Sequence, residues 1–406
     1  MSKRVSYLLA DFGYTGGNLV LYNFMDKLCE RGYTVFAVAP YETISWKPGF
    51  SSHVIRKKYQ GVKYKLVERV TRLGKPWAKR MRLIDCVGRK ILGKPPSDIV
   101  QQIKWLTERL VRNCPKSDIV IATYHTTAFA AYLLMENAVP FYHIQHYEEL
   151  FKQDDLGRKV ARLTYYMPLI LIANSTWLQE QIKKRFGREP YLLKPGIDTS
   201  VFRPYYDLAI KYKNANPVRI LSYCSLAKFK AWDEAVKGME IVFKVLGDKR
   251  IEWVVFGEIP PKRPNVPCKF VGKVFGESLA RLYSSAHIVF MNSWYESFPL
   301  PPLEAMACGT GVVTTRFGTE DYAFDKINSM VIPPGEPLLL AEAIVYLVEN
   351  MDFTKQLAQA GIETAVQFTW DCAADHLEEI LHIGIDNFPS ETFSDIADLI
   401  RGKFSK

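Results

Sequence analysis

The chain has no long hydrophobic run. Its longest apolar stretches, such as 168–173 and 288–291, are far shorter than the roughly 20 residues that a helix needs to cross a bilayer. A short apolar run follows the basic N-terminus, but Asp11 interrupts it and no small-residue cleavage site comes after it. We therefore interpret the start of the chain as the first strand of a domain and expect no membrane-spanning segment.

Several chemical signatures are also missing. The seven cysteines are scattered and form no C-x-x-C pair, which is typical of free thiols in a reducing cytoplasm. No His/Cys cluster has metal-ligand spacing and no D-x-D occurs, so we expect neither a metal nor another cofactor. The G-x-G-x-x-G and G-x-x-x-x-G-K-[ST] loops are absent too, which argues against a dinucleotide-dependent oxidoreductase and a P-loop enzyme.

Positive charge is abundant but local. The net charge is +10, and the segment 56–94 holds 14 Lys and Arg against two acidic residues, so the remaining chain is slightly acidic. Apolar residues at spacings of three and four predict a basic amphipathic helix in this segment, interrupted near Pro76. Such a helix could lie on an anionic membrane or face an acidic ligand, or its stripe could pack on its own domain. Nucleic acid is not an expected partner because no base-reading module accompanies the charge.

The order of predicted elements indicates an α/β fold. Strand-like runs alternate with helical periodicity from residue 4 onward, and the alternation begins again near 218 after a turn-rich stretch. We predict two doubly wound domains, at 1–193 and 213–368, joined by a linker at 194–212. A C-terminal helix and tail at 369–406 would return toward the first domain. Ligands of such folds bind at the carboxyl ends of the strands, and a cleft between the domains is the expected site.

One stretch, YESFPLPPLEAMACG from Tyr295 to Gly309, places two glutamates eight positions apart around a proline-rich loop. Pro301 or Pro302 fits the first position of a helix, where an N–H is not needed. The start of that helix would attract an anion such as phosphate, and Glu304 is predicted in its first turn. Taken alone, Glu304 could equally be a glutamate favoured by the helix dipole and Glu296 an ordinary loop carboxylate.

This spacing resembles the E-x7-E motif of the retaining GT-B glycosyltransferases of family 4. The resemblance extends over about residues 5–385 and includes the T-G-G loop, R-G-Y-T-V, P-G-I-D-x-x-x-F-x-P and G-T-E-D. It implies a GT-B fold with two Rossmann-like domains and a nucleoside-diphosphate sugar as donor. Glu304 would bind the ribose hydroxyls and Glu296 the hydroxyls of the transferred sugar. The donor diphosphate would lie between them, next to Phe298, Pro299 and Leu300.

The resemblance also implies a cationic clamp for the diphosphate. The family usually has an arginine and, five residues later, a lysine after the first strand of the second domain. In this sequence the lysine matches Lys230, but the arginine position holds Ser225. Lys228 is a candidate substitute from the same loop. A surface lysine pair without a ligand is the alternative.

On the N-terminal side, Gly16 and Gly17 let the backbone approach a ligand. The resemblance places this loop over the diphosphate and the acceptor side. It also matches His146 to a pocket histidine near the reacting carbon, and His125 is a second candidate on the acceptor side. His143 and His146 end one predicted strand, so only one of the two is expected to face the cleft unless the strand ends between them.

We therefore predict a cytoplasmic, retaining, metal-independent glycosyltransferase of the hexosyltransferase type. Its acceptor would be a glycan or a lipid-linked molecule in polysaccharide or glycoconjugate biosynthesis, and the 56–94 segment suggests a peripheral position on the inner face of the membrane. FYHIQHYEELF with SFPLPPLEAMACG is also similar to rhamnosyltransferases of bacterial surface-polysaccharide assembly. The alternative is a noncatalytic protein that binds a sugar nucleotide or a glycan on the same fold.

Overall fold

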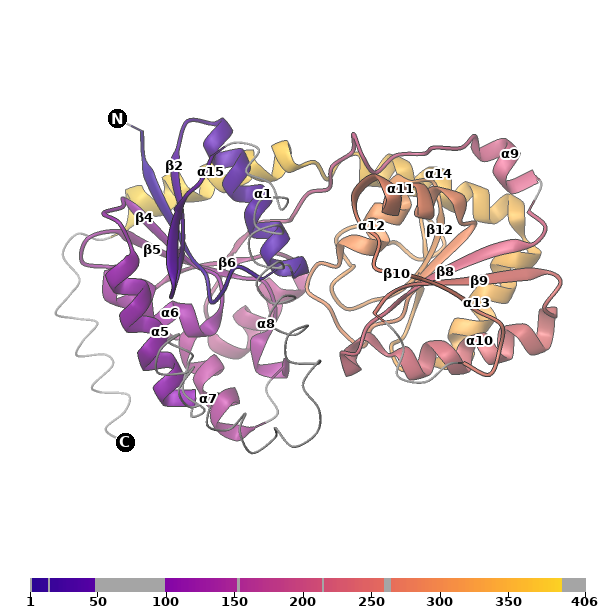
Figure 1. Cartoon of the computed structure of the whole chain (residues 1–406), viewed down its shortest axis with the longest axis horizontal. Coiled ribbons are helices and arrows are strands. Elements are labelled where there is room, and N and C mark those ends of the chain that lie inside the picture. Colours follow the sequence, from indigo (N-terminus) through magenta and orange to yellow (C-terminus); the bar gives the residue numbers. More distant parts are fainter. Residues whose placement is uncertain are drawn as a thin grey trace, which may run out of the picture. The chain divides into compact units, whose positions relative to one another are not determined.

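The structure, a computed structural model, describes residues 2–13, 15–47, 99–151, 154–213, 215–258 and 264–388. It divides into two compact units (Figure 1). Unit 1 comprises 1–174, 179–193 and 374–406, and unit 2 comprises 175–178 and 194–373. Within the described ranges, no helix combines the length and the apolar character that a bilayer crossing requires.

Unit 1 is built on a seven-stranded sheet in the order β3-β2-β1-β4-β5-β6-β7. Only β3 runs antiparallel, paired with β2, and the other neighbours are parallel. Its strands are nearly all apolar, as expected where helices cover both faces of a parallel sheet. The strands are β1 (Arg4–Leu8), β2 (Thr34–Ala39), β3 (Glu42–Ser45), β4 (Ile119–Ala122), β5 (Val139–Ile144), β6 (Ile170–Ala173) and β7 (Tyr191–Leu192).

The helices of this unit follow the strands in alternation. They are α1 (Gly16–Glu30), α5 (Ile99–Asn113), α6 (His125–Leu134), the 3-10 turn η3 (Glu148–Phe151), α7 (Asp155–Thr164) and α8 (Thr176–Phe186), whose residues from 179 onward belong to this unit. The last helix of the chain, α15 (Trp370–Asn387), begins in unit 2, and from Ala374 its residues belong to unit 1. There Arg31 forms ion pairs with Asp375 at 2.6 Å and with Glu378 at 2.9 Å.

Unit 2 has a six-stranded parallel sheet in the order β10-β9-β8-β11-β12-β13. Its strands are β8 (Val218–Cys224), β9 (Ile251–Gly257), β10 (Lys269–Gly272), β11 (Ile288–Met291), β12 (Gly311–Thr315) and β13 (Met330–Ile332). Its helices are α9 (Leu208–Lys213), η4 (Lys228–Lys230), α10 (Trp232–Leu246), α11 (Gly276–Ser285), α12 (Leu300–Ala307), α13 (Pro337–Glu349) and α14 (Met351–Ala365).

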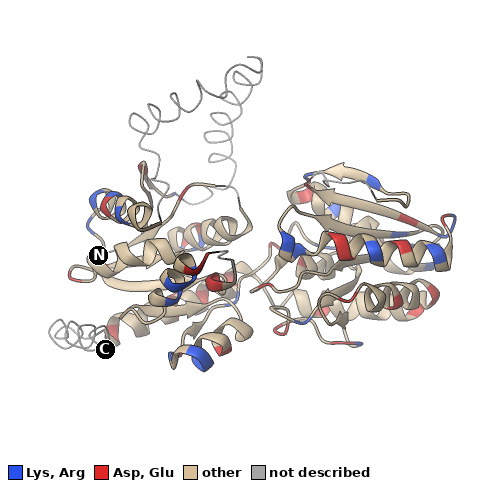
Figure 2. Cartoon of the chain, turned by 90° about the horizontal axis from the view of Figure 1, so that it is seen from below, with Lys and Arg blue, Asp and Glu red and all other residues tan. Residues whose placement is uncertain are grey.

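Alternate side chains of the central strands fill two cores in unit 2. Ile220 and Trp253 belong to the core under α10 and α13, whereas Leu221 and Val254 belong to the core under α11 and α12. This alternation follows from the two-residue repeat of a strand. In both units the helices carry basic and acidic residues together, while most strand residues are uncharged (Figure 2). Charged residues therefore lie mainly on the helices and loops that surround the two sheets.

The two doubly wound units confirm the predicted fold class. Apart from β3 and β7, each strand of the two sheets coincides with a strand-like run of the sequence. Sequence reasoning missed the short edge strands β3 and β7, and it missed α9, which falls at the end of the predicted linker. The basic helix predicted within 56–94 lies outside the described residues.

Candidate active site

The site is formed by two loops that leave neighbouring strands of unit 2 at their carboxyl ends. One loop follows β8 and leads through η4 into α10, and the other follows β11 and leads into α12. Because β8 and β11 are paired side by side, their loops emerge next to each other. They enclose a crevice whose other wall is the end of β12. It is lined by Tyr223, Lys230, Met291, Asn292, Ser293, Glu296, Pro299, Pro301, Pro302, Thr314, Thr315 and Thr319.

Backbone and ring contacts fasten the two loops together. The amide N–H of Trp294 donates to the carbonyl of Phe229 at 2.7 Å. The Asn292 side chain donates to the carbonyl of Ala231 at 2.9 Å. The rings of Phe229 and Tyr295 stack with centroids 5.5 Å apart. Since Ala231 has a left-handed φ of 55° where η4 passes into α10, this turn is fixed by its contacts rather than by local preference. The loops thus form one framework.

Lys230 and Glu296 meet inside this framework. The ammonium of Lys230 donates to Oε1 of Glu296, and the Glu296 side chain is 9% exposed. Lys230 also lies 5.2 Å from the ring centroid of Phe229, whose face attracts a cation. The structure therefore brings together the two charged residues that the sequence predicted as a diphosphate contact and a sugar contact.

The segment that follows β12 packs against the backbone of Glu296. Gly318 has a φ of +90°, and a Cβ at this position would lie 2.5 Å from the carbonyl oxygen of Glu296. Only glycine combines this φ with this close approach. The amide of Glu296 donates to the carbonyl of Phe317 at 3.1 Å, and the hydroxyl of Tyr322 donates to the carbonyl of Pro299 at 2.6 Å. The G-T-E-D stretch therefore holds the glutamate loop in position.

The start of α12 differs from the sequence prediction. The helix begins at Leu300 with Pro299 as its cap, so Pro301 is its second residue rather than its first, and Glu304 lies beyond its first turn. Prolines fit here because the first four N–H groups of a helix have no partner within it. They also remove donors, because three of the four residues from Pro299 to Pro302 lack an N–H. The residues from Pro299 to Pro302 therefore offer an anion a single N–H, that of Leu300, and Lys230 supplies a full positive charge in the same crevice.

Glu304 lies outside the lining of the crevice, on α12 one turn farther into the protein. The hydroxyl of Tyr283 lies 3.5 Å from its carboxylate. Burial raises the pKa of Glu304 to about 7, an effect that the Tyr283 hydrogen bond partly opposes. This carboxyl therefore changes its charge near neutral pH, and a ligand hydroxyl would be a favourable partner for its ionised form.

Ser225, at the position where the resemblance would place an arginine, takes part in a network of polar contacts. The Ser225 hydroxyl donates to Oε2 of Glu258 at 3.1 Å, and the amide of Leu226 donates to the same oxygen at 2.9 Å. Lys273 lies 3.5 Å from the other oxygen of Glu258. These contacts, led by the Leu226 hydrogen bond, keep the pKa of Glu258 below its usual value. Lys228 is exposed on η4, so the cation that the structure connects to Ser225 through Glu258 is Lys273.

Two of the residues predicted to bind the sugar-nucleotide donor have side chains that pack in the protein core. Phe298 is only 6% exposed and packs edge-on against Tyr322 with centroids 5.2 Å apart. Leu300 packs against the same core as Phe298. Their side chains hold the loop on the core, so any donor contact from these two residues would come from their backbone.

The remaining candidates lie in unit 1. Gly16 is the first residue of α1 and Gly17 the second, after Thr15 caps the helix by accepting from the amide of Asn18 at 3.2 Å. His143 is within β5 and fully buried against Phe24, and burial lowers its pKa to about 4.

The strand β5 ends at Ile144, before His146, which is half-buried in the loop that follows. The alternation of side chains along a strand therefore does not determine the direction of His146 relative to His143. His125 is fully buried as the first residue of α6, a position from which its side chain cannot meet an acceptor in this structure.

Sequence reasoning missed several crevice residues. Thr314 and Thr315 end β12, and Tyr223 lies near the end of β8. Their position at the carboxyl ends of parallel strands was the signal that could have identified them. Glu258, which lies beside the crevice loop rather than in its lining, was missed because its contact depends on which residue stands at 225.

Among the described residues, no group of three or more His, Cys, Asp or Glu side chains is placed to hold a metal ion.

The chain is similar to known glycosyltransferases. The family model described as "Glycosyl transferases group 1" matches residues 219–350. D-inositol 3-phosphate glycosyltransferase of Corynebacterium diphtheriae is 34% identical over 105 residues, which cover 26% of this chain and 25% of that relative. The enzyme of the same name from Corynebacterium aurimucosum is 22% identical over 341 residues, which cover 74% of this chain and 81% of the relative. The alignment with the first of these relatives thus covers about a quarter of that relative's length.

Solved structures share the fold. HepE of Anabaena, in complex with UDP-glucose, has a TM-score of 0.67 at 16% identity and covers 94% of this chain and 99% of its own. Sucrose-phosphate synthase of Thermosynechococcus elongatus has a TM-score of 0.64 at 16% identity, covering 94% and 98%. Together with the two sheets described above, these findings show that the chain has the GT-B fold and that its residues 219–350 match the glycosyl transferases group 1 model.

Proposed function

We propose that the protein is a retaining glycosyltransferase that moves a sugar from a nucleoside-diphosphate sugar to a glycan or a lipid-linked acceptor. The observation that supports this most directly is the pairing of Lys230 with Glu296 in a crevice at the carboxyl ends of β8 and β11. A cation beside a carboxylate suits a donor that presents phosphate and sugar hydroxyls next to each other. The relatives named for glycosyl transfer and HepE, solved with UDP-glucose, support the same donor class.

In the proposed reaction, the bond between the sugar C1 and the β-phosphate oxygen breaks while the acceptor oxygen bonds to C1. The acceptor attacks from the face that the phosphate leaves, so the configuration at C1 is kept. The acceptor proton passes to a phosphate oxygen of the departing nucleoside diphosphate. Lys230 and the N–H of Leu300 would stabilise the charge that develops on this leaving group, and Glu296 would hold the sugar hydroxyls.

The remaining assignments rest on the resemblance. Glu304 would bind the ribose, and His146, Gly16 and Gly17 are further donor contacts that the resemblance implies. Because Lys230 supplies charge to the diphosphate, we propose that no metal ion is required. A rhamnosyl donor and a role in polysaccharide assembly are proposals from the similarity of the FYHIQHYEELF segment.

A turnover screen tests this proposal. The purified protein is incubated with UDP-, GDP-, dTDP- and ADP-sugars, first alone and then with glycan or lipid-linked acceptors, and the released nucleoside diphosphate is measured. We expect one nucleotide class to turn over and NMR of the product to show retained anomeric configuration. Tight binding of a sugar nucleotide without release would favour the noncatalytic alternative. Inverted product would contradict the retaining mechanism.

We also propose that the basic segment 56–94 brings the enzyme to an anionic membrane from the cytoplasmic side. Its excess charge supports this, since each Lys or Arg near such a surface contributes about 1 kcal/mol. Neutralising Lys79, Arg80 and Arg82 to Gln should reduce co-sedimentation with phosphatidylserine-containing vesicles. Unchanged co-sedimentation would contradict the proposal.

A further inference from the structure

The loop that leaves β5 and carries His146 is held at its near end. The carbonyl of Gln145 accepts a hydrogen bond from the side chain of Asn174 at 3.1 Å, and Asn174 follows the neighbouring strand β6. The side-chain amide of Gln145 lies against Gly17, where a Cβ would be 3.3 Å from Oε1. This end of the loop therefore contacts both the residue that follows β6 and the start of α1.

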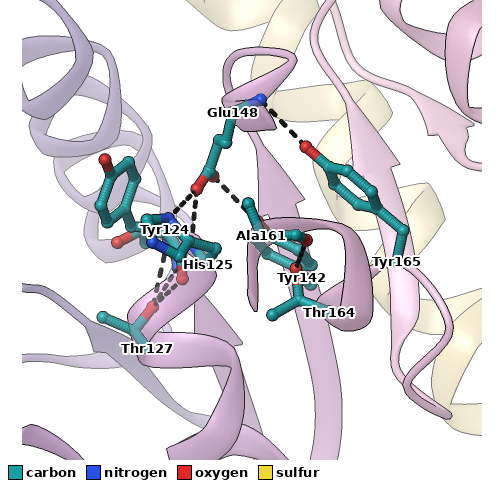
Figure 3. A network of polar contacts seen from close by, with 9 residues as sticks. Tyr124, His125, Thr127, Tyr142, Glu148, Ala161, Thr164 and Tyr165 are labelled. Carbon is teal, nitrogen blue, oxygen red and sulfur yellow. Dashed lines mark hydrogen bonds and ion pairs between the residues drawn. The ribbon is translucent and has the colours of Figure 1, made fainter. Parts of the chain in front are cut away.

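The far end of the same loop is held by a buried carboxylate, that of Glu148. Oε2 of Glu148 accepts from the amide of His125 at 2.7 Å and lies 2.5 Å from Nδ1 of that imidazole. Oε1 accepts from the hydroxyl of Tyr142 at 2.8 Å. The amide of Glu148 donates to the hydroxyl of Tyr165 at 2.9 Å. Figure 3 shows these contacts converging from α6, β5 and the end of α7.

This anchor costs free energy that an apolar contact would not. His125 is 0% exposed and Glu148 1% exposed, and a buried carboxylate is stable only when it is paired and hydrogen-bonded. Within the described part of the chain, Nε2 of His125 has no hydrogen-bond partner, so the ring proton belongs on Nδ1, where Glu148 accepts it. A well-packed apolar pair would be as stable or more so. The pair is therefore better explained by the geometry that it imposes than by stability.

We infer that His125 and Glu148 form a positioning pair that fixes the loop carrying His146. The pair joins the start of α6, directly after β4, to the turn η3, two residues beyond His146. It thus sets the height of His146 above the carboxyl ends of β4 and β5. The inference rests on the proposed function, in which His146 contacts the donor sugar, and it replaces the predicted role of His125 as an acceptor contact.

A double-mutant cycle tests the pair. Glu148→Gln keeps the size of the side chain but replaces one acceptor oxygen with a donor, so the loop loses part of its anchor. Because a displacement of about 1 Å at a reacting group can reduce the rate on the order of 100-fold, we expect kcat for donor turnover to fall 10- to 100-fold with KM changed less than about 3-fold. In a His146→Ala background, Glu148→Gln should change kcat less than about 2-fold.

Glu149 offers a matched control on the same turn. Its carboxylate accepts from Tyr147 and from the exposed Arg162, and within the described part of the chain none of its hydrogen bonds or ion pairs involves α6. Glu149→Gln should leave kcat within about 2-fold of the wild type. If Glu148→Gln fails to fold, as judged by circular dichroism, His125→Asn, which keeps a side-chain N–H donor, takes its place in the cycle.

A second readout does not require turnover. In spectra of protein with 15N-labelled histidine, Glu148→Gln should shift the ring signals of His146 as well as those of His125 and leave those of His376, an exposed residue of α15, unchanged. An equal loss of kcat in both backgrounds, or an unshifted His146, would overturn the inference. Absence of turnover in the wild type would instead count against the proposed function, while the histidine spectra would still test the positioning pair.

Discussion

The ammonium of Lys230 donates to the carboxylate of Glu296 across two loops that leave neighbouring strands. The two charges therefore neutralise each other in the crevice. In the proposed function, a diphosphate would have to compete with Glu296 for Lys230, and a sugar hydroxyl would have to compete with Lys230 for Glu296. The complete donor would offer each residue a new partner, whereas a nucleoside diphosphate without its sugar would leave Glu296 uncompensated.

This exchange predicts opposite effects of Glu296→Gln on binding and on transfer. Removal of the competing carboxylate should lower the Kd for a nucleoside diphosphate about 3- to 10-fold, the worth of a partly exposed ion pair. Donor turnover should fall on the order of 100-fold, because a charged partner of the sugar hydroxyls is lost. Calorimetry measures the change in Kd, and nucleotide release measures the change in turnover.

Glu277→Gln, which changes a surface ion pair with Arg281, is the control. Weaker nucleotide binding by Glu296→Gln would show that the pair supports the site rather than competing with the donor.

The raised pKa of Glu304 predicts a pH dependence of donor binding. A nucleotide sugar has no group of its own that titrates near pH 7, so it is the suitable probe. Because the ionised carboxylate is the better acceptor for ribose hydroxyls, affinity should rise as the pH rises through about 7 and then level off. In Glu304→Gln the affinity should be nearly independent of pH between about 6 and about 8, a range of about one pH unit on either side of the wild-type pKa. The same pH dependence in both proteins would contradict the assignment of Glu304 to the ribose.

The same group predicts a stability effect with a definite sign. A carboxyl whose pKa is raised on folding binds its proton more tightly in the native state, so its contribution to stability falls as the pH rises from about 4.5 to about 7. Glu304→Gln should therefore be more stable than the wild type above pH 7, by on the order of 1–3 kcal/mol, with little difference below pH 4.5. Urea unfolding at several pH values measures this difference. A variant that is less stable at pH 8 than the wild type would contradict it.

The close approach of Gly318 to Glu296 predicts that Gly318→Ala damages the site. A methyl group would lie 2.5 Å from the Glu296 carbonyl oxygen in a backbone conformation with φ +90°. Gly335 is the matched control, since its φ is +78° and no atom lies within 4 Å of the position of its Cβ. Gly335→Ala should cost about 1–2 kcal/mol through backbone strain alone. Gly318→Ala should cost more and also reduce donor turnover, and equal unfolding free energies for the two variants would contradict this account.

Much of the fold follows from local patterns. The strands are apolar runs between turn residues and the helices have clear periodicity, so β8, β11 and α10 could be placed without coordinates. The edge strands β3 and β7 could not, because the sequence ETIS of β3 contains no apolar run and β7 has only two residues. The site was predicted less completely. Glu296 and Lys230 were found because a motif marks them. Spacing alone did not reveal the depth of Glu304 on α12, which depends on where three prolines allow the helix to begin.

The burial of His125 shows why side-chain roles were harder to predict than positions. A histidine after a strand end can face a ligand or the interior, and the sequence is the same in both cases. The outcome depends on Glu148, 23 residues farther along the chain, whose carboxylate holds the imidazole. Likewise, the consequence of Ser225 depends on Glu258 from the next strand. Such pairings arise from strand order, which the local sequence does not encode.

In the proposed function, Lys230 supplies the charge that holds the donor diphosphate. The most direct test is calorimetric titration of UDP, GDP, dTDP and ADP into the wild type, Lys230→Ala and Lys228→Ala. We expect one nucleotide to bind the wild type, Lys230→Ala to weaken it at least about 30-fold, and Lys228→Ala to change it less than about 3-fold, because a charge-assisted contact to phosphate contributes roughly 2 kcal/mol or more. Unchanged affinity in Lys230→Ala would contradict the account and would place the diphosphate, if it binds at all, away from this crevice.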